Sequence, residues 1–390
     1  MKVAVVSEFY PRAHDPVLGI WAHRQALAAR DAGAEVRVIV LHRPVPPRAT
    51  SPREAPRALA TMLRQPRTAA IDGLEVHYVP FLAPPRAGSY GSWGAWAAPT
   101  LAIALRRLRS RFPFQLVHAH NAVPAADAVL RAGIRKPLVV SVHGADVYFT
   151  APRYPAGSRA VQRAYATARL VLANSAGTER DARSLGAERT RVVRLGADVP
   201  AEPAPPHAGA PTLVTVGHLV ARKRHADVVR ALWLLRERQP ELRYLVIGDG
   251  PEREPLARLA AELGVADRVE LAGQLPNAQA LERAHAANVF VMPSVDEAFG
   301  VVYVEAMAAG LPAIGTRGEA GPQEIASAGD GLRLVAPGDV EALAAEIETL
   351  VAEPEYARDL GAAGRDTVTR AFTWEVCGRA TVAAYEDALR

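Results

Sequence analysis

Short apolar runs alternate with amphipathic stretches along almost the whole chain. The runs are continuously apolar, which suits strands of a sheet that is covered on both faces. The stretches between them, such as 20–32 and 100–111, place apolar residues at helical spacing. This alternation predicts an α/β fold with parallel sheets. The predicted strands are 3–7, 35–41, 76–79, 116–118, 138–142 and 170–173 in the first half, and 212–216, 243–247, 269–271, 289–292, 312–315 and 332–335 in the second.

A proline-rich segment separates two halves that each repeat this alternation. Five prolines fall within 199–211, and such segments are semi-rigid spacers. We therefore predict two domains of similar size, over 1–199 and 212–370, joined by a linker over 200–211 and separated by a cleft. Ligands of open parallel sheets bind beyond the carboxyl ends of the strands, so motifs that directly follow strands deserve most weight.

The composition restricts the class of protein. The chain has 390 residues, 49% of them hydrophobic, which excludes a disordered protein. No apolar run reaches the roughly 18 residues that a membrane span needs. The first residues become polar too soon for a signal peptide. A single cysteine, Cys377, excludes an internal disulfide and multi-cysteine metal sites. It fits a reducing compartment, so we expect a cytoplasmic protein.

Basic residues are concentrated in the first half. Residues 1–200 contain 28 Lys and Arg but 13 Asp and Glu, whereas residues 201–390 contain 18 and 28. Such a field favours an anionic partner. Segment 43–70 adds six arginines and six prolines, and we predict a long, mobile, basic insertion there.

The segment 293–312 carries the strongest chemical signal. Glu297 and Glu305 are eight residues apart, and a helix predicted over 301–309 is ended by Gly310 and Pro312. Glu297 would lie in the loop before this helix and Glu305 inside it. The free N–H groups at the helix start favour phosphate, and carboxylates accept hydrogen bonds from sugar hydroxyls. The pattern suits a nucleotide sugar, but a helix start with one surface glutamate explains the spacing equally well.

This segment resembles the E-x₇-E motif of glycosyltransferase family 4, a family of retaining transferases with the GT-B fold. The segments 247–251, 271–276, 321–325, 336–339 and 371–374 are also similar to the family, so the resemblance covers nearly the whole chain. It implies two Rossmann-like domains with parallel sheets that face each other across a cleft. The acceptor would bind the N-terminal domain and the nucleotide sugar the C-terminal one. A C-terminal helix over 371–390 would cross back to the N-terminal domain.

The resemblance also implies roles for individual residues. Glu305 would bind the ribose hydroxyls of the nucleotide, and Glu297 would bind hydroxyls of the donor sugar near the reacting centre. The backbone N–H groups expected to meet the sugar and the phosphates belong to Phe299, Gly300, Val301 and Val302.

A basic loop follows the predicted strand 212–216. Arg222 and Lys223 would bind the diphosphate and stabilise the negative charge that develops on the leaving group. The loop resembles the family pattern G-R-L-x-x-x-K-G, in which Lys223 matches the lysine. His218 stands where arginine is usual and Arg224 where glycine is usual, so the charge at position 218 differs from the family. Without the resemblance, a solvated basic loop is the better explanation.

The N-terminal half contributes a glycine and a set of histidines. Gly19 lies in the loop after the first strand, where the family places glycines near the donor phosphates. The form Gly19-Ile20-Trp21 resembles the branch that synthesises cell-surface polysaccharides or glycolipids. His120 and His143 follow successive strands, whose carboxyl ends meet at one edge of a sheet. The resemblance places His120 near the transferred sugar, and His143 with Asp146 in the acceptor-side wall.

We expect no metal and no cofactor other than the donor substrate. No D-x-D pair, which holds a divalent cation in the other main transferase fold, occurs in the chain. Arg222, Lys223 and a helix N-terminus would act in its place.

The predicted function is that of a retaining, metal-independent hexosyltransferase. It would move a sugar from a nucleotide-diphosphate sugar to a hydroxyl of a sugar, lipid-linked or phosphorylated acceptor in cell-envelope glycan synthesis. The predicted catalytic residues are Glu297, His120, Lys223 and Arg222. Two alternatives stay open: a nucleotide-sugar epimerase of the same fold, and a non-catalytic nucleotide-sugar-binding subunit. The absence of an aromatic-rich basic motif argues against a nucleic-acid partner.

An anionic membrane surface is a further expected partner, at the inner face of the plasma membrane. Leu101, Leu105 and Leu108 share one stripe of a predicted helix whose end carries four arginines. This is an interfacial pattern, although packing of the same stripe onto the sheet explains it as well.

Overall fold

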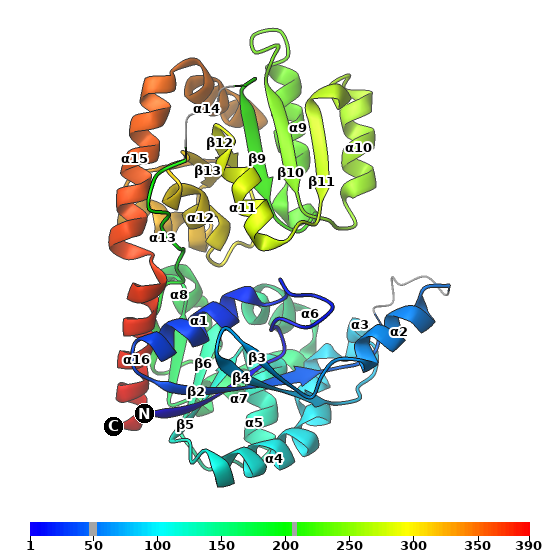
Figure 1. The fold of residues 1–390 in the computed structure, drawn as a ribbon, viewed down its shortest axis with the longest axis vertical. Coiled ribbons are helices and arrows are strands. Elements are labelled where there is room, and N and C mark those ends of the chain that lie inside the picture. Colours follow the sequence, from blue (N-terminus) through cyan, green and yellow to red (C-terminus); the bar gives the residue numbers. More distant parts are fainter. Residues whose placement is uncertain (47–52, 205–208) are drawn as a thin grey trace. The chain divides into compact units, whose positions relative to one another are not determined.

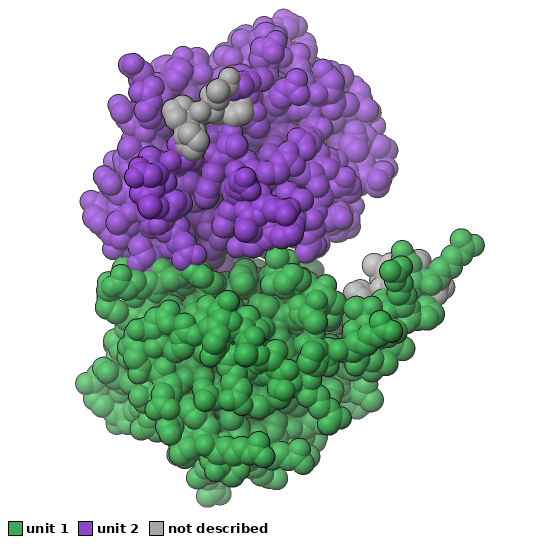
Figure 2. Space-filling model, viewed as in Figure 1, with its two compact units in different colours: residues 1–195, 374–390 green, residues 196–373 purple. Residues whose placement is uncertain are grey.

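The computed structural model describes residues 1–46, 53–204 and 209–390 (Figure 1). They form two compact units (Figure 2). Unit 1 consists of residues 1–195 and 374–390, and unit 2 of residues 196–373. The unit boundaries fall four residues before and three residues after the domain limits that we predict at 199 and 370.

Unit 1 is built on an eight-stranded sheet with the order β3-β4-β2-β1-β5-β6-β7-β8. All neighbours are parallel except β3 and β4. The short edge strands β3 and β8 are absent from our prediction, because their four and three residues are too few to stand out as apolar runs. The strands are β1 (Lys2–Ser7), β2 (Glu35–His42), β3 (Thr68–Ile71), β4 (Leu74–Pro80), β5 (Leu116–His120), β6 (Leu138–Val142), β7 (Leu170–Ala173) and β8 (Thr190–Val192).

Helices cover both faces of this sheet and create a hydrophobic core on each. The helices of unit 1 are α1 (Ile20–Asp31), α2 (Ala55–Leu63), α3 (Arg86–Ser89), α4 (Trp93–Arg111), α5 (Asp127–Arg131), α6 (Ala151–Arg153), α7 (Pro155–Thr167), α8 (Ala176–Ser184) and α16 (Trp374–Leu389), of which α2 buries no residue.

Unit 2 contains a parallel six-stranded sheet with the order β11-β10-β9-β12-β13-β14. Its strands are β9 (Thr212–Val216), β10 (Arg243–Ile247), β11 (Val269–Gly273), β12 (Val289–Val291), β13 (Ala313–Thr316) and β14 (Leu332–Val335). Its helices are α9 (His225–Leu234), α10 (Arg253–Glu262), α11 (Asn277–His285), α12 (Val301–Ala308), α13 (Ala320–Ala328), α14 (Val340–Ala352) and α15 (Pro354–Ala371). The predicted α/β class with parallel sheets is confirmed, and each unit is Rossmann-like.

The last helix of the chain belongs to the first unit. α16 packs along α1, and a Cβ atom added at Gly378 would lie 2.2 Å from the carbonyl oxygen of Ala28. The glycine therefore lets the two helices approach closely. Further along α16, the buried hydroxyl of Tyr385 lies 2.8 Å from Nδ1 of His118 on β5.

The structure corrects two expectations for unit 1. The stripe Leu101, Leu105 and Leu108 of α4 is buried in the core, so it does not form an interfacial surface. The insertion predicted over 43–70 contains the regular elements α2 and the first part of β3, while its residues 47–52 lie outside the described residues. The linker prediction at 205–208 lies outside them as well.

Candidate functional site

The predicted residues of the C-terminal half meet at the carboxyl ends of β9 and β12. Lys223 lies in a short helical turn (Ala221–Lys223) after β9, and Glu297 lies in the loop between β12 and α12. Nζ of Lys223 donates a hydrogen bond of 2.6 Å to Oε2 of Glu297. Nη1 of Arg222 lies 3.5 Å from the same oxygen. Residues 74 positions apart thus form one charged cluster at the sheet edge.

Burial and charge act in opposite directions on this cluster. Burial alone raises the pKa of the Glu297 carboxyl, but the positive charges of Lys223 and Arg222 and hydrogen bonds from Lys223 and Ser294 outweigh it and lower the pKa. Burial lowers the pKa of Lys223, and the carboxylate of Glu297 partly offsets this. Both side chains are almost fully buried. Glu297 is therefore held as a carboxylate beside cations.

Several residues that sequence reasoning missed fix the position of Glu297. Ser294 Oγ donates to its Oε2 over 3.0 Å, and Glu319 Oε2 accepts from its backbone N–H over 3.0 Å. The N–H of Gly321 donates to the Glu297 carbonyl. Ser294 belongs to the quoted motif, so its nearness to Glu297 was available from the sequence. Glu319 follows the next strand, and its contact depends on the sheet order.

The start of α12 lies next to Glu297. Gly300 precedes the helix with φ 79°, and a Cβ atom there would lie 2.5 Å from the ring of Tyr303, so the position requires glycine. Val301 and Val302 are half-buried in the first turn. Phe299 is buried against Phe372, with ring centroids 5.9 Å apart, so its backbone rather than its side chain is available to a ligand.

His218 and Glu305 belong to the segments that follow β9 and β12. Glu305 is in the second turn of α12, inside the helix as the spacing predicts, and it is half-buried. His218 is exposed in the loop after β9. That loop is supported by the segment after β10, because Leu219 N–H donates to the Asp249 carbonyl over 3.0 Å. Gly250 packs against the backbone of Leu219 and leaves no room for a Cβ atom.

In unit 1, Gly19 begins α1 with φ 65°. A Cβ atom at this position would lie 2.2 Å from the backbone of Phe9. The glycine therefore permits a close crossing of the chain beside the carboxyl end of β1.

His120 and His143 are brought together in unit 1. Nδ1 of His120 lies 2.8 Å from Nε2 of His143, and their ring planes differ by 10°. His120 is buried, and burial lowers its pKa well below the usual value. The ring of Trp21 lies 6.2 Å from that of His143, centroid to centroid. Both histidines are therefore uncharged at neutral pH.

Asp146 does not lie on a wall of the lobe, which corrects our expectation. Its carboxylate is fully buried and accepts hydrogen bonds from the N–H groups of Ala122 (2.6 Å) and Val123 (3.3 Å) and from the hydroxyl of Tyr165. Burial raises its pKa to about 6, against the effect of these bonds. Asp146 therefore fixes the loop that directly follows His120.

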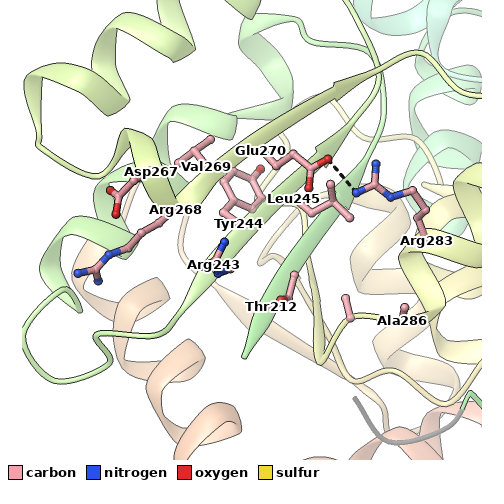
Figure 3. Close-up of a pocket in the computed structure, with 11 residues that line it drawn as sticks. Thr212, Arg243, Tyr244, Leu245, Asp267, Arg268, Val269, Glu270, Arg283 and Ala286 are labelled. Atoms are coloured by element: carbon pink, nitrogen blue, oxygen red, sulfur yellow. Dashed lines mark hydrogen bonds and ion pairs between the residues drawn. The ribbon is translucent and has the colours of Figure 1, made fainter. Parts of the chain in front are cut away.

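A hollow of about 520 Å³ lies at the opposite edge of the sheet in unit 2 (Figure 3). It is formed around the amino ends of β9, β10 and β11. Arg283, which lines it, is paired with Glu270 at 2.8 Å. The hollow is separate from the Lys223–Glu297 cluster, which lies beyond the carboxyl ends.

Two further features of the described residues concern metals and membranes. None of their His, Cys, Asp and Glu side chains form a group of three or more that is suited to hold a metal ion. No helix that they form is long and apolar enough to cross a bilayer.

Family models match both halves of the chain. Residues 18–200 match the model described as Glycosyltransferase Family 4, and residues 202–367 match the model described as Glycosyl transferases group 1.

Two curated relatives each match more than two thirds of the chain. A GDP-mannose-dependent alpha-(1-6)-phosphatidylinositol monomannoside mannosyltransferase of Mycolicibacterium smegmatis is 31% identical over 304 residues, which are 72% of this chain and 78% of the relative. A 2-deoxystreptamine glucosyltransferase of Streptomyces kanamyceticus is 29% identical over 77% of this chain and 84% of the relative.

Solved structures have the same fold. A sucrose-phosphate synthase from Thermosynechococcus elongatus matches with a TM-score of 0.80 at 22% identity, over 99% of this chain and 98% of that one. HepE of Anabaena, in complex with UDP and glucose, matches with a TM-score of 0.72 at 20% identity over 99% of both chains. Together, the family models, the mannosyltransferase relative and the fold show that this chain is a GT-B protein that belongs to glycosyltransferase family 4.

Proposed function

We propose that the protein transfers a hexose, with retention of anomeric configuration, from a nucleotide-diphosphate sugar to an acceptor hydroxyl. The observation that carries the proposal is the buried pair of Lys223 and Glu297 beside the start of α12. A cation, a carboxylate and free backbone N–H groups meet there within a few residues. This combination suits a ligand that has both phosphates and hydroxyls.

Each group has a defined task in this mechanism. Lys223 and Arg222 bind the diphosphate and stabilise its charge as the bond to the anomeric carbon breaks. Glu297 accepts hydrogen bonds from hydroxyls of the donor sugar and orients it. The backbone N–H groups of residues 299–302 complete the phosphate site, and Glu305 binds the ribose. The acceptor hydroxyl attacks from the face that the diphosphate leaves, and a phosphate oxygen takes its proton.

The donor is tested by exposing the protein to UDP-, GDP-, dTDP- and ADP-sugars. A donor that binds the folded protein raises the melting temperature. GDP-mannose and UDP-glucose are the first candidates, because one relative depends on GDP-mannose and HepE has been solved with UDP and glucose. The proposal would be contradicted if none of these donors raised the melting temperature and none of them released nucleotide.

The class of reaction is tested by nucleotide release with and without acceptor. A transferase releases nucleotide faster when acceptor is present, and the product sugar keeps the anomeric configuration of the donor. Conversion of the nucleotide sugar without acceptor would instead show an epimerase, and tight binding without turnover would show a binding subunit. We expect EDTA to leave the rate unchanged, since Lys223 and Arg222 supply the positive charge.

We extend the proposal to a lipid-linked or phosphorylated acceptor at an anionic membrane surface. Among the described residues, the large apolar side chains that are exposed all lie in unit 1. They are Leu59, Leu63, Leu82, Trp96, Ile103 and Leu389. α2 carries two of them and projects from the body of unit 1 (Figures 1 and 2). On α4, Trp96 and Ile103 are seven residues apart and share one face.

Charge supports the same surface. Arg57 on α2 and Arg64 directly after it are exposed, as are Arg106 and Arg107 on α4. Each basic residue near an anionic bilayer adds roughly 1 kcal/mol of binding free energy, which salt reduces. We therefore propose α2 and the outer face of α4 as the membrane-binding elements, in place of the buried leucine stripe.

Co-sedimentation with vesicles tests this surface. We expect the protein to bind vesicles that contain anionic lipid, to ignore neutral ones, and to dissociate at high salt. Leu59→Asp with Leu63→Asp should abolish binding, whereas Arg258→Glu on the exposed face of α10 in unit 2 should not. If the protein binds neither vesicle type at low salt, the acceptor is a soluble molecule.

A further inference from the structure

Either partner can be the donor in the hydrogen bond between His120 and His143, because each ring nitrogen of a neutral histidine can carry the proton or accept it. The 10° angle between the rings allows an N–H group of one to point along the 2.8 Å line to the nitrogen of the other. His120 contributes Nδ1 and His143 contributes Nε2. Each ring therefore keeps one outer nitrogen, Nε2 on His120 and Nδ1 on His143.

These outer nitrogens are shielded, and neither has a hydrogen-bond partner among the described residues. Burial lowers the pKa of both histidines, and for His120 the neighbouring rings of His118 and His143 add to the effect. Two neutral imidazoles carry one proton each, so one proton lies between the rings and one lies on an outer nitrogen.

Two arrangements satisfy this count. In the first, His120 donates from Nδ1, its Nε2 is a bare acceptor, and His143 carries its proton on Nδ1. In the second, His143 donates from Nε2, so Nε2 of His120 carries a proton and donates outward. The shared proton moves from Nδ1 of His120 to Nε2 of His143. The proton lost at Nδ1 of His143 is balanced by one gained at Nε2 of His120. Because both nitrogens are buried, these protons exchange with water or a substrate hydroxyl only when local motion uncovers them.

We propose that His143 is a positioning residue, which sets whether Nε2 of His120 donates or accepts a hydrogen bond toward a hydroxyl of the substrate. A sugar hydroxyl both donates and accepts, so the pair matches it in either arrangement. The nature of the substrate in this inference rests on the proposed function. The coupling between the two histidine rings is independent of that function.

His118 provides a contrast two residues earlier on β5. Its Nδ1 lies 2.8 Å from the hydroxyl of Tyr385, and its Nε2 lies 2.7 Å from Oγ of Ser141. Both nitrogens of this ring are thus engaged inside the protein. Ser141 contacts His118 rather than the coupled pair, which makes Ser141→Ala a matched control for disturbing a buried histidine contact.

The direct test measures ¹⁵N chemical shifts of the histidine rings in the unmodified protein and in His143→Leu, His143→Gln and Ser141→Ala. Ring shifts report which nitrogen carries the proton. We expect His143→Leu to change the shifts of both His120 nitrogens and to leave those of His118 in place. Ser141→Ala should do the reverse. Unchanged His120 shifts in His143→Leu would overturn the inference.

Kinetics supply the second readout. We expect His143→Leu to lower kcat for nucleotide release at least about tenfold, the scale on which removing a partner that orients a histidine acts. The KM for the nucleotide sugar should stay unchanged. Glutamine has both a donor and an acceptor, so His143→Gln should restore most of the rate; equal loss in both variants would overturn the inference. If the unmodified protein turns over no nucleotide sugar, the proposed function fails, whereas the ¹⁵N shifts still decide the coupling.

Discussion

Lys223 and Glu297 each carry a buried charge that the other compensates. Removing one partner leaves an uncompensated buried charge, which costs about 3–5 kcal/mol. Replacing both by apolar or neutral groups avoids that cost. We therefore expect Lys223→Met and Glu297→Gln to destabilise unit 2 strongly as single variants and much less in combination.

Denaturant unfolding of the four proteins in this double-mutant cycle measures the coupling. Activity should not follow stability: the double variant should fold well yet turn over donor orders of magnitude more slowly. Lys223→Met should also weaken nucleoside diphosphate binding by about 1.5–3 kcal/mol, as loss of a charged hydrogen bond does. Additive effects on stability would show that the two charges do not depend on each other.

At the residue scale, the motifs predict which polar residues lie near the ends of strands, but they do not predict what those residues contact. Motif spacing brought out Glu297 and Lys223 separately, but their 2.6 Å contact joins two loops 74 positions apart and depends on β9 lying beside β12. Glu319 was missed for the same reason. Asp146 was singled out by its motif, yet its carboxylate is used to hold backbone N–H groups. Short motifs identify a polar residue but do not distinguish a ligand contact from an internal one.

At the scale of single elements, the contact between α16 and α1 depends on Gly378. A larger side chain there meets the backbone of Ala28 and forces the helices apart. We expect Gly378→Leu to destabilise unit 1 by about 1–3 kcal/mol, as overpacking does. Ala383→Leu places the same leucine side chain on the exposed face of α16 and should have little effect.

Differential scanning calorimetry of the two variants tests this prediction. If the two units unfold in separate transitions, only that of unit 1 should move in Gly378→Leu. A melting profile that is identical in both variants would show that the close approach of the two helices is not required.

Hydrophobic patterning predicts where helices and strands begin and end more reliably than it predicts what packs against them. The long apolar strands were predicted nearly to the residue, because a sheet covered on both faces imposes a continuous apolar run. α4 shows the limit: its leucine stripe is correct, but periodicity does not reveal whether sheet or lipid covers it. The outward residues Trp96 and Ile103 look unremarkable in the sequence, since isolated apolar residues are common on surfaces.

At the scale of the whole molecule, buried neutral histidines make folding sensitive to acid. Burial lowers the pKa of His118 to about 3 and acts in the same direction on His120 and His143. In the unfolded chain these rings titrate near their ordinary value of 6.5. Below that pH the unfolded state binds protons that the folded state does not, so stability present above pH 6.5 is lost as the pH falls.

Asp146 acts in the opposite direction. Its folded pKa of about 6 lies above its ordinary value of 3.8, so the folded state binds this proton more tightly and gains stability as the pH falls through that window. Three histidines outweigh one aspartate, each contributing up to roughly 1.4 kcal/mol per pH unit. We expect the unfolding free energy of unit 1 to fall between pH 6.5 and pH 4.

Denaturant unfolding at a series of pH values measures this slope. In His118→Gln, the glutamine amide can still form hydrogen bonds with Tyr385 and Ser141, but it does not titrate. It should therefore reduce the slope by roughly 1.4 kcal/mol per pH unit. A slope equal to that of the unmodified protein would show that His118 is already protonated in the folded state.

The position of α16 has a consequence for the order in which the protein is made. A ribosome releases residues 1–195 first, but the core of unit 1 still lacks Cys377 and Tyr385, which pack into it from the far end of the chain. Unit 2 is continuous and has all of its residues once 373 has emerged. The unit whose synthesis starts first is thus completed after unit 2, and His118 lacks its tyrosine partner until residue 385 has left the exit tunnel.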